Sequence, residues 1–208
     1  MFVEMNVGEF LDKLASKSST PGGGSVAALA GANAAALVSM VCNLTIGKKG
    51  YEDVQEDVAE ILHNSEKLRY EFTKLIDLDA EAFNEIMDAY KLPKTSDEEK
   101  SVRKEAIQVA TRKASQVPLR TLELTVELLS LASESAKVGN KNVLSDAAVA
   151  ASLASSAMES AWFNVEINLR SINDDVFVNE LIERGESLMD EGDELYETTL
   201  DTVDERIG

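Results

Sequence analysis

Residues 25–47 read SVAALAGANAAALVSMVCNLTIG, without one charged side chain. The stretch is close to the roughly 20 residues that a membrane span needs. Ala, Gly, Ser and Asn fill most of it, however, and a helix so poor in Leu, Ile and Phe inserts weakly into lipid. The stretch therefore predicts a helix, over about 25–45, that is buried in protein and packs closely through small side chains. We expect no membrane partner.

Helical patterns continue on both sides of this stretch. Asn6, with Glu9 three residues later, has the spacing of a capping box for a first short helix. Ser96 or Thr95 starts a later helix, which Pro118 should kink because proline removes a backbone donor. This helix is expected over about 97–137. Three others are expected over about 51–91, 142–169 and from 174 almost to the end.

Composition and helix length predict the fold class. The chain has 3 prolines in 208 residues, is rich in helix-tolerant residues and lacks long β-branched runs. A 40-residue helix spans about 60 Å, so a single globule cannot cover such rods evenly. The sequence therefore predicts one all-α domain over residues 1–208, an elongated bundle of long antiparallel helices that forms a homodimer.

The net charge narrows the choice of partners and compartment. At −18, the chain is repelled by nucleic acid and by anionic lipid, so we expect neither as a partner. Cys42 is the only cysteine, so no internal disulfide can form. The first residues carry no cleavage-site pattern, and a cytoplasmic location is expected.

Two helices carry polar residues on faces that should be apolar. Steps of three and four place Asp79 on the inward stripe of the 51–91 helix, where an unpaired carboxylate is costly. Asp79 is therefore either paired with Arg or Lys from another helix or a site carboxylate. In the 142–169 helix, Asp146 shares a face with Asn164 and Asn168. Asp146 also suits a helix first turn, and it lies about 27 Å from Asn164 along a straight helix.

The loop TPGGGS, residues 20–25, is the strongest local signal. Its glycines let the backbone approach a ligand closely, and it feeds into a helix N-terminus with free N–H groups. The alternative is a flexible turn with Ser25 as the N-cap. His63, the sole histidine, has no metal-ligand spacing around it and is expected on the surface.

Several segments together resemble the cyclodeaminase domain of the formiminotransferase-cyclodeaminase family and stand-alone methenyltetrahydrofolate cyclohydrolases. These segments read STPGGGSVAALAGANAAALVSMVCNLTIGKK, DLDAEAFNEIMDAYKLPK, GNKNVLSDAAVAA and AWFNVEINL. The resemblance implies closure of 5-formiminotetrahydrofolate to 5,10-methenyltetrahydrofolate with loss of ammonia. It also implies a folate partner, with or without glutamate extensions, and neither metal nor cofactor.

The resemblance suggests roles for particular residues. Asp79 and Asp146 are the candidate carboxylates for proton transfer. The substrate-binding candidates are Pro21, Gly22, Gly23, Gly24, Ser25, Asn164 and Asn168, together with Lys48, Lys49, Lys91 and Lys94 for the carboxylates of the folate tail. The lysines could also serve only for solvation. The alternative functions are a methenyltetrahydrofolate cyclohydrolase and a non-catalytic helical scaffold.

Overall fold

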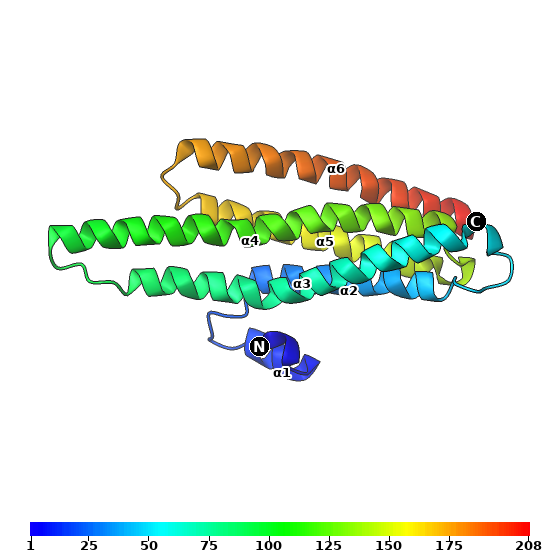
Figure 1. Ribbon diagram of the computed structural model, residues 1–208, viewed down its shortest axis with the longest axis horizontal. Helices are drawn as coiled ribbons and strands as arrows, with labels where there is room; N and C mark the ends of the chain where they lie inside the picture. Colours follow the sequence, from blue (N-terminus) through cyan, green and yellow to red (C-terminus); the bar gives the residue numbers. More distant parts are fainter.

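A computed structural model describes all residues from 1 to 208 and contains helices but no strands. The α-helices are α1 (Val7–Leu14), α2 (Gly23–Asn43), α3 (Gln55–Tyr90), α4 (Asp97–Val138), α5 (Leu144–Leu169) and α6 (Asp175–Ile207). Short 3-10 turns are η1 (Phe2–Glu4), η2 (Glu52–Val54) and η3 (Lys141–Val143). Helices α2 to α6 run along one long axis (Figure 1). The predicted all-α class and elongated bundle are confirmed.

Local capping explains where two of the helices begin. The Asn6 side chain accepts from the backbone N–H of Glu9 at 2.9 Å, and the Glu9 carboxylate accepts from the backbone N–H of Asn6 at 3.2 Å. Ser96 and Glu99 form the same reciprocal box at the start of α4. Both caps satisfy N–H groups that have no partner within the helix. Helix α4 continues through Pro118 without ending there (Figure 1).

Helix α2 is a core helix, as its uncharged sequence predicted. It packs against α3, α4 and α5, and Ala28, Ala34 and Ala35 are fully buried. A Cβ on Gly31 would overlap the ring of Phe72, so the close contact between α2 and α3 depends on a glycine there. By length and composition α2 could cross a membrane, but here its small side chains line the interior of the bundle.

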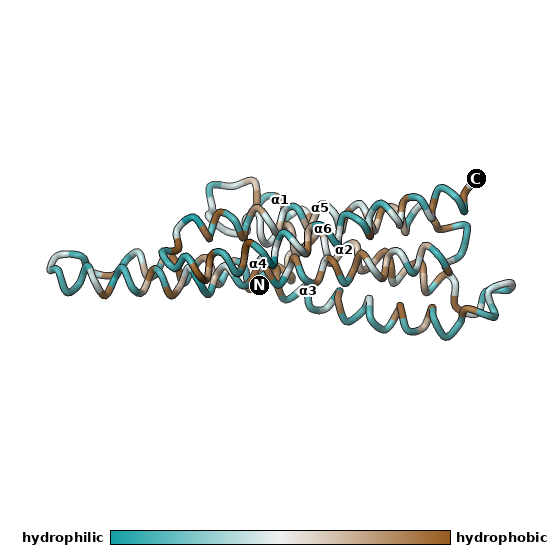
Figure 2. Tube along the Cα trace, turned by 90° about the horizontal axis from the view of Figure 1, so that it is seen from above, coloured by the Kyte–Doolittle hydropathy of each residue, from teal (hydrophilic) through white to brown (hydrophobic).

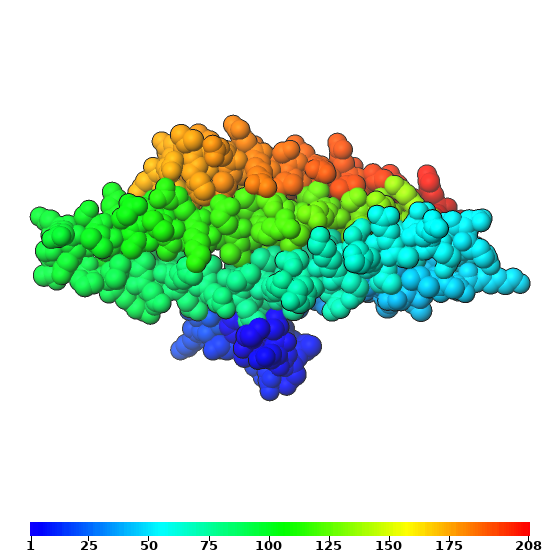
Figure 3. Space-filling view, viewed as in Figure 1, coloured from blue at the N-terminus to red at the C-terminus, as the bar shows by residue number.

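Two parts of the molecule project from the bundle. The hairpin of α3 and α4 extends beyond the ends of α5 and α6 and is mostly hydrophilic at its tip (Figures 1 and 2). The N-terminal segment with α1 forms a separate small lobe (Figure 3). It is tethered to α3 by the backbone N–H of Phe2, which donates to Asp77 Oδ1 at 2.6 Å. The N-terminus of α2 lies against α3 and α5, and residues of α4 line a cavity at the same place.

Candidate active site

The glycine loop is partly helical. Gly22 is the N-cap and α2 begins at Gly23, so the expectation that Ser25 caps the helix is wrong. The first backbone bond of the helix runs from the N–H of Val26 to the carbonyl of Gly22 at 3.0 Å. The N–H groups of Gly23, Gly24 and Ser25 belong to the first turn and have no acceptor within the helix. The turn therefore carries the partial positive charge of a helix N-terminus.

Asp79 lies directly against this helix N-terminus. The Ser25 hydroxyl donates to Asp79 Oδ2 at 3.0 Å. A Cβ on Gly24 would overlap Asp79 Oδ1, so the carboxylate reaches the turn only because residue 24 has no side chain. No ion pair to Arg or Lys involves Asp79 in this structure, so the structural alternative considered for this residue is wrong.

The surroundings of Asp79 raise the pKa of its carboxyl group above the usual value. Burial is the largest cause, because it disfavours the charged form. The hydroxyl and the backbone N–H of Ser25 act in the opposite direction, since both stabilise the carboxylate. A carboxyl group with a raised pKa exchanges protons closer to neutral pH than an exposed aspartate does.

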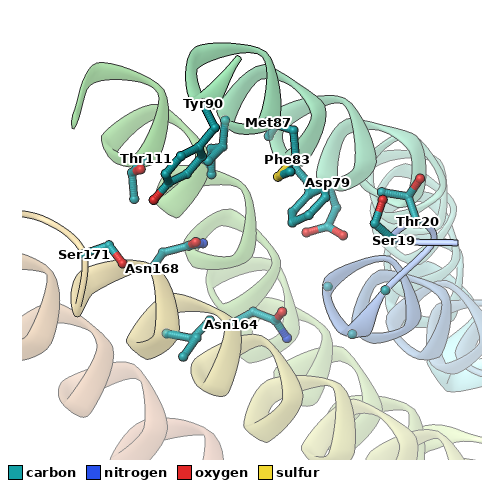
Figure 4. Close-up of a pocket in the computed structure, with 17 residues that line it drawn as sticks. Ser19, Thr20, Asp79, Phe83, Met87, Tyr90, Thr111, Asn164, Asn168 and Ser171 are labelled. Carbon is teal, nitrogen blue, oxygen red and sulfur yellow. The ribbon is translucent and has the colours of Figure 1, made fainter. Parts of the chain in front are cut away.

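Asn164 and Asn168 face Asp79 from α5 (Figure 4). The Asn164 side chain donates from Nδ2 to the carbonyl of Ser160 at 2.8 Å, which leaves its Oδ1 available to accept. A Cβ on Gly23 would lie 3.2 Å from Asn164 Nδ2, so this amide packs tightly on the glycine turn. The Asn168 side chain lines the same cavity, one helical turn further along α5.

These groups surround a cavity of about 420 Å³. Helix α3 supplies its apolar wall with Ala82, Phe83, Ile86, Met87 and Tyr90. Ser19, Thr20, Thr111, Ala114, Ile167 and Ser171 complete the lining. Aromatic and aliphatic side chains thus lie opposite the amides and the glycine turn (Figure 4). A cavity with one apolar wall and one polar wall is suited to a flat ring that has a polar edge.

Some of the predicted site residues lie at the opposite end of the bundle. Lys48 and Lys49 follow the C-terminus of α2, which is about 30 Å from its N-terminus at 1.5 Å per residue. Asp146 is in the first turn of α5, at this same far end. The turn after α2 and the segment before α5 are in contact at this end, where the backbone N–H of Asn140 donates to Thr45 Oγ1 at 2.9 Å. Within one chain, Asp146 therefore does not line the cavity with Asp79.

The remaining candidates lie near the cavity without lining it. Lys91 directly follows Tyr90, is 73% exposed and pairs with Asp88 at 2.7 Å. Lys94 is exposed in the loop between α3 and α4. Pro21 and Ser25 are both buried beneath the glycine turn, and the Thr20–Pro21 peptide bond is cis. Neither side chain lines the cavity, so neither faces a bound ligand.

Phe83, Met87 and Tyr90 of the apolar wall were not predicted as site residues from the sequence. They follow Asp79 at four, eight and eleven residues, which is the spacing of one face of a helix. That spacing could have identified them once Asp79 was chosen. Thr111 and Ser171 gave no such signal, because they reach the cavity through the packing of α4 and α5.

The cavity is suited to proton transfer on a neutral or cationic ligand. Asp79 is its only charged lining residue. A carboxylate without a counter-ion attracts positive charge that develops on a bound ligand, and it can accept and return a proton. No group of three or more His, Cys, Asp or Glu side chains is arranged to hold a metal ion.

Fold and cavity together define an all-α protein whose cavity holds a single carboxylate without a counter-ion. A sequence model described as formiminotransferase-cyclodeaminase matches residues 6–187. The chain belongs to this family, and the resemblance noted in the sequence is confirmed.

Relatives and a solved structure agree with the family. A methenyltetrahydrofolate cyclohydrolase from Methylorubrum extorquens is 46% identical over 95% of both chains. The formimidoyltransferase-cyclodeaminase of Mus musculus is 37% identical over 88% of this chain, which spans 34% of that longer protein. The crystal structure of formiminotetrahydrofolate cyclodeaminase from Thermotoga maritima superposes with a TM-score of 0.88 at 33% identity, covering 98% of each chain.

Proposed function

We propose that the cavity binds a tetrahydrofolate with a one-carbon unit at N5 or N10, and that Asp79 transfers protons to and from the nitrogen and oxygen atoms bonded to that carbon. The chain is an enzyme of folate interconversion, so the alternative of a non-catalytic scaffold is wrong. The observation that carries the proposal is one uncompensated carboxylate on a helix N-terminus, opposite an apolar wall that suits a pterin. The 5,10-methenyl form is a delocalised cation, which a nearby carboxylate stabilises.

The first candidate reaction is the cyclodeaminase reaction. N10 attacks the carbon of the protonated formimino group, whose nitrogen already carries two hydrogens, and the N10 proton passes to Asp79. The same proton returns to the departing nitrogen, which leaves as ammonia, and the methenyl cation remains. The structural match to a cyclodeaminase favours this reaction. It requires general acid–base chemistry only, which typically contributes about 10²–10⁴-fold.

The second candidate is the cyclohydrolase reaction, which the 46% identical, full-length relative favours. Water adds to the methenyl carbon and gives its proton to Asp79. That proton then moves to N5 as the C–N5 bond breaks, and the remaining hydroxyl proton is released to solvent as the formyl C=O forms, which yields a 10-formyl product. The same carboxylate and the same cation take part in both reactions, so one cavity suits either.

The methenyl chromophore separates the two reactions. Purified protein is mixed with 5-formiminotetrahydrofolate in one experiment and with 5,10-methenyltetrahydrofolate in another. Appearance of methenyl absorbance together with free ammonia identifies the deaminase. Loss of methenyl absorbance faster than in buffer identifies the hydrolase. No catalysed change with either substrate, at pH values on both sides of neutrality, would reject the proposed function.

A further inference from the structure

Ser25 is a fully buried hydroxyl that touches the reactive carboxylate but not the cavity. It is the third residue of α2, and it is absent from the cavity lining that includes Gly22, Gly23 and Gly24. Its Oγ donates to Asp79 Oδ2 at 3.0 Å from 54 residues away in sequence. Ser25 therefore cannot bind substrate directly through its side chain, and its effect on the reaction must pass through Asp79.

The contact holds the carboxylate in one orientation. Oδ1 lies over Gly24, where a Cβ would overlap it, while Oδ2 accepts from the Ser25 hydroxyl. One oxygen is therefore set against the helix backbone and the other against a buried donor. Asp79 extends from α3, and its carboxylate lies against the first turn of α2 at the edge of the cavity (Figure 4).

We propose that Ser25 is a positioning residue that fixes the Asp79 carboxylate toward the cavity and favours its ionised form. This inference rests on the proposed role of Asp79 in proton transfer. Ser25 thus differs from its predicted role as a substrate ligand. A donor that bonds to the charged form of an acid stabilises that form relative to the protonated one.

Few groups near Asp79 can change the protonation of its carboxyl group. Of the residues that line the cavity, Tyr90 of α3 is the only titratable one besides Asp79. The glycine turn and the lining parts of α4 and α5 contribute no charged side chain. Burial raises the pKa of Asp79, and the hydroxyl and N–H of Ser25 are the groups that lower it. Without the hydroxyl, the pKa rises further.

Ser25→Ala tests the inference, and Ser133→Ala is its matched control. Ser133 is a buried helical serine of α4 whose hydroxyl has no hydrogen-bond partner, so its loss should leave the pH profile unchanged. For Ser25→Ala we expect the acidic limb of the kcat–pH profile to move upward by about one pH unit or more. KM should stay within about twofold, because no substrate contact is removed.

Two further variants test the inference if Ser25→Ala does not fold, and an NMR titration tests it without measuring activity. Ser25→Thr retains the hydroxyl and should restore the wild-type limb, whereas Ser25→Cys, a weaker donor, should shift it less than alanine does. The Asp79 carboxyl carbon is identified by NMR as the resonance missing from Asp79→Asn. The titration midpoint of this carboxyl carbon should rise in Ser25→Ala. If the alanine variant does not fold, a rise should still be measured in Ser25→Cys.

The outcomes separate this inference from the proposed function. If Asp79→Asn is inactive but Ser25→Ala keeps the wild-type pH profile and the wild-type midpoint, Ser25 is not a positioning residue and the proposed function stands. If Asp79→Asn turns over normally, the proposed role of Asp79 is wrong, and the inference falls with it. An inactive Asp79→Asn with an upward shift in Ser25→Ala supports both.

Discussion

At Asp79, burial and hydrogen bonding act on one carboxyl group in opposite directions. Burial is the stronger influence and raises the pKa, so the ionised side chain opposes folding. The unfolded chain binds a proton at Asp79 only below about pH 4. As the pH rises above that value, the unfolded chain loses this proton before the folded protein does, so stability falls until the folded carboxyl is ionised as well. Below that value, both states are protonated and this loss of stability disappears.

Asp79→Asn should therefore stabilise the protein while it removes activity. The asparagine oxygen can still accept from Ser25, but it cannot transfer a proton. We expect kcat to fall by about 10²-fold or more. The Tm should rise at pH 7, and this gain should vanish when melting is repeated below about pH 4. Glu81→Gln, an exposed acid two residues along α3, is the control. Wild-type turnover by Asp79→Asn would refute the role of this carboxylate.

Alanine substitutions in the glycine turn should lower kcat by amounts that differ from one position to the next. A Cβ at Gly24 would overlap Asp79 Oδ1, whereas a Cβ at Gly22 would meet only the Ser19 carbonyl, at 3.9 Å. We expect Gly24→Ala to lower kcat by about 10²-fold, because the carboxylate is displaced by roughly an ångström. Gly22→Ala should lose distinctly less. Steady-state kinetics on both variants check this order, and equal losses would contradict it.

At the scale of elements, the loop after α3 and the first half of α4 carry positive charge in an otherwise acidic chain. Residues 91–120 contain 8 Lys or Arg and 4 Asp or Glu, a net charge of +4 within a total of −18. The segment starts beside the cavity at Tyr90 and extends past it along α4. The carboxylates of a glutamate tail would be attracted to residues 91–120, so Lys91 and Lys94 remain candidates for tail binding. Lys48 and Lys49, at the far end, are not within reach of the same ligand in one chain.

Lys94→Ala tests this attraction. Exposed ion pairs contribute about 0.2–1 kcal/mol, so KM for a polyglutamylated folate should rise by about 1.5- to 5-fold. KM for the monoglutamate should change less, and the difference should shrink in high salt because salt screens exposed charges. Lys67→Ala, an exposed lysine in the middle of α3, is the control. An equal rise for both tail lengths would count against a tail contact at Lys94.

For the whole molecule, we expect a homodimer. Helix α2 exposes only uncharged residues, and the neighbouring helix α5 exposes Phe163 (66%) and Ile167 (58%). Copies with a charge of −18 repel each other, so an uncharged face is where two can meet at least cost. Light scattering should give twice the 22.6 kDa of one chain. Phe163→Glu should weaken the dimer, and a wild-type mass of one chain would contradict it.

Helix positions, caps and inward faces follow from the sequence, because periodicity and capping depend on residues only three or four positions apart. The capping box of Asn6 with Glu9 and the inward position of Asp79 were predicted in this way. Tertiary structure alone decided which acid meets the glycine turn. Asp79 and Ser25 are 54 residues apart, and their contact depends on how far α3 slides along α2. That register is set by side-chain packing along the whole interface, such as Phe72 against Gly31, which no local pattern encodes.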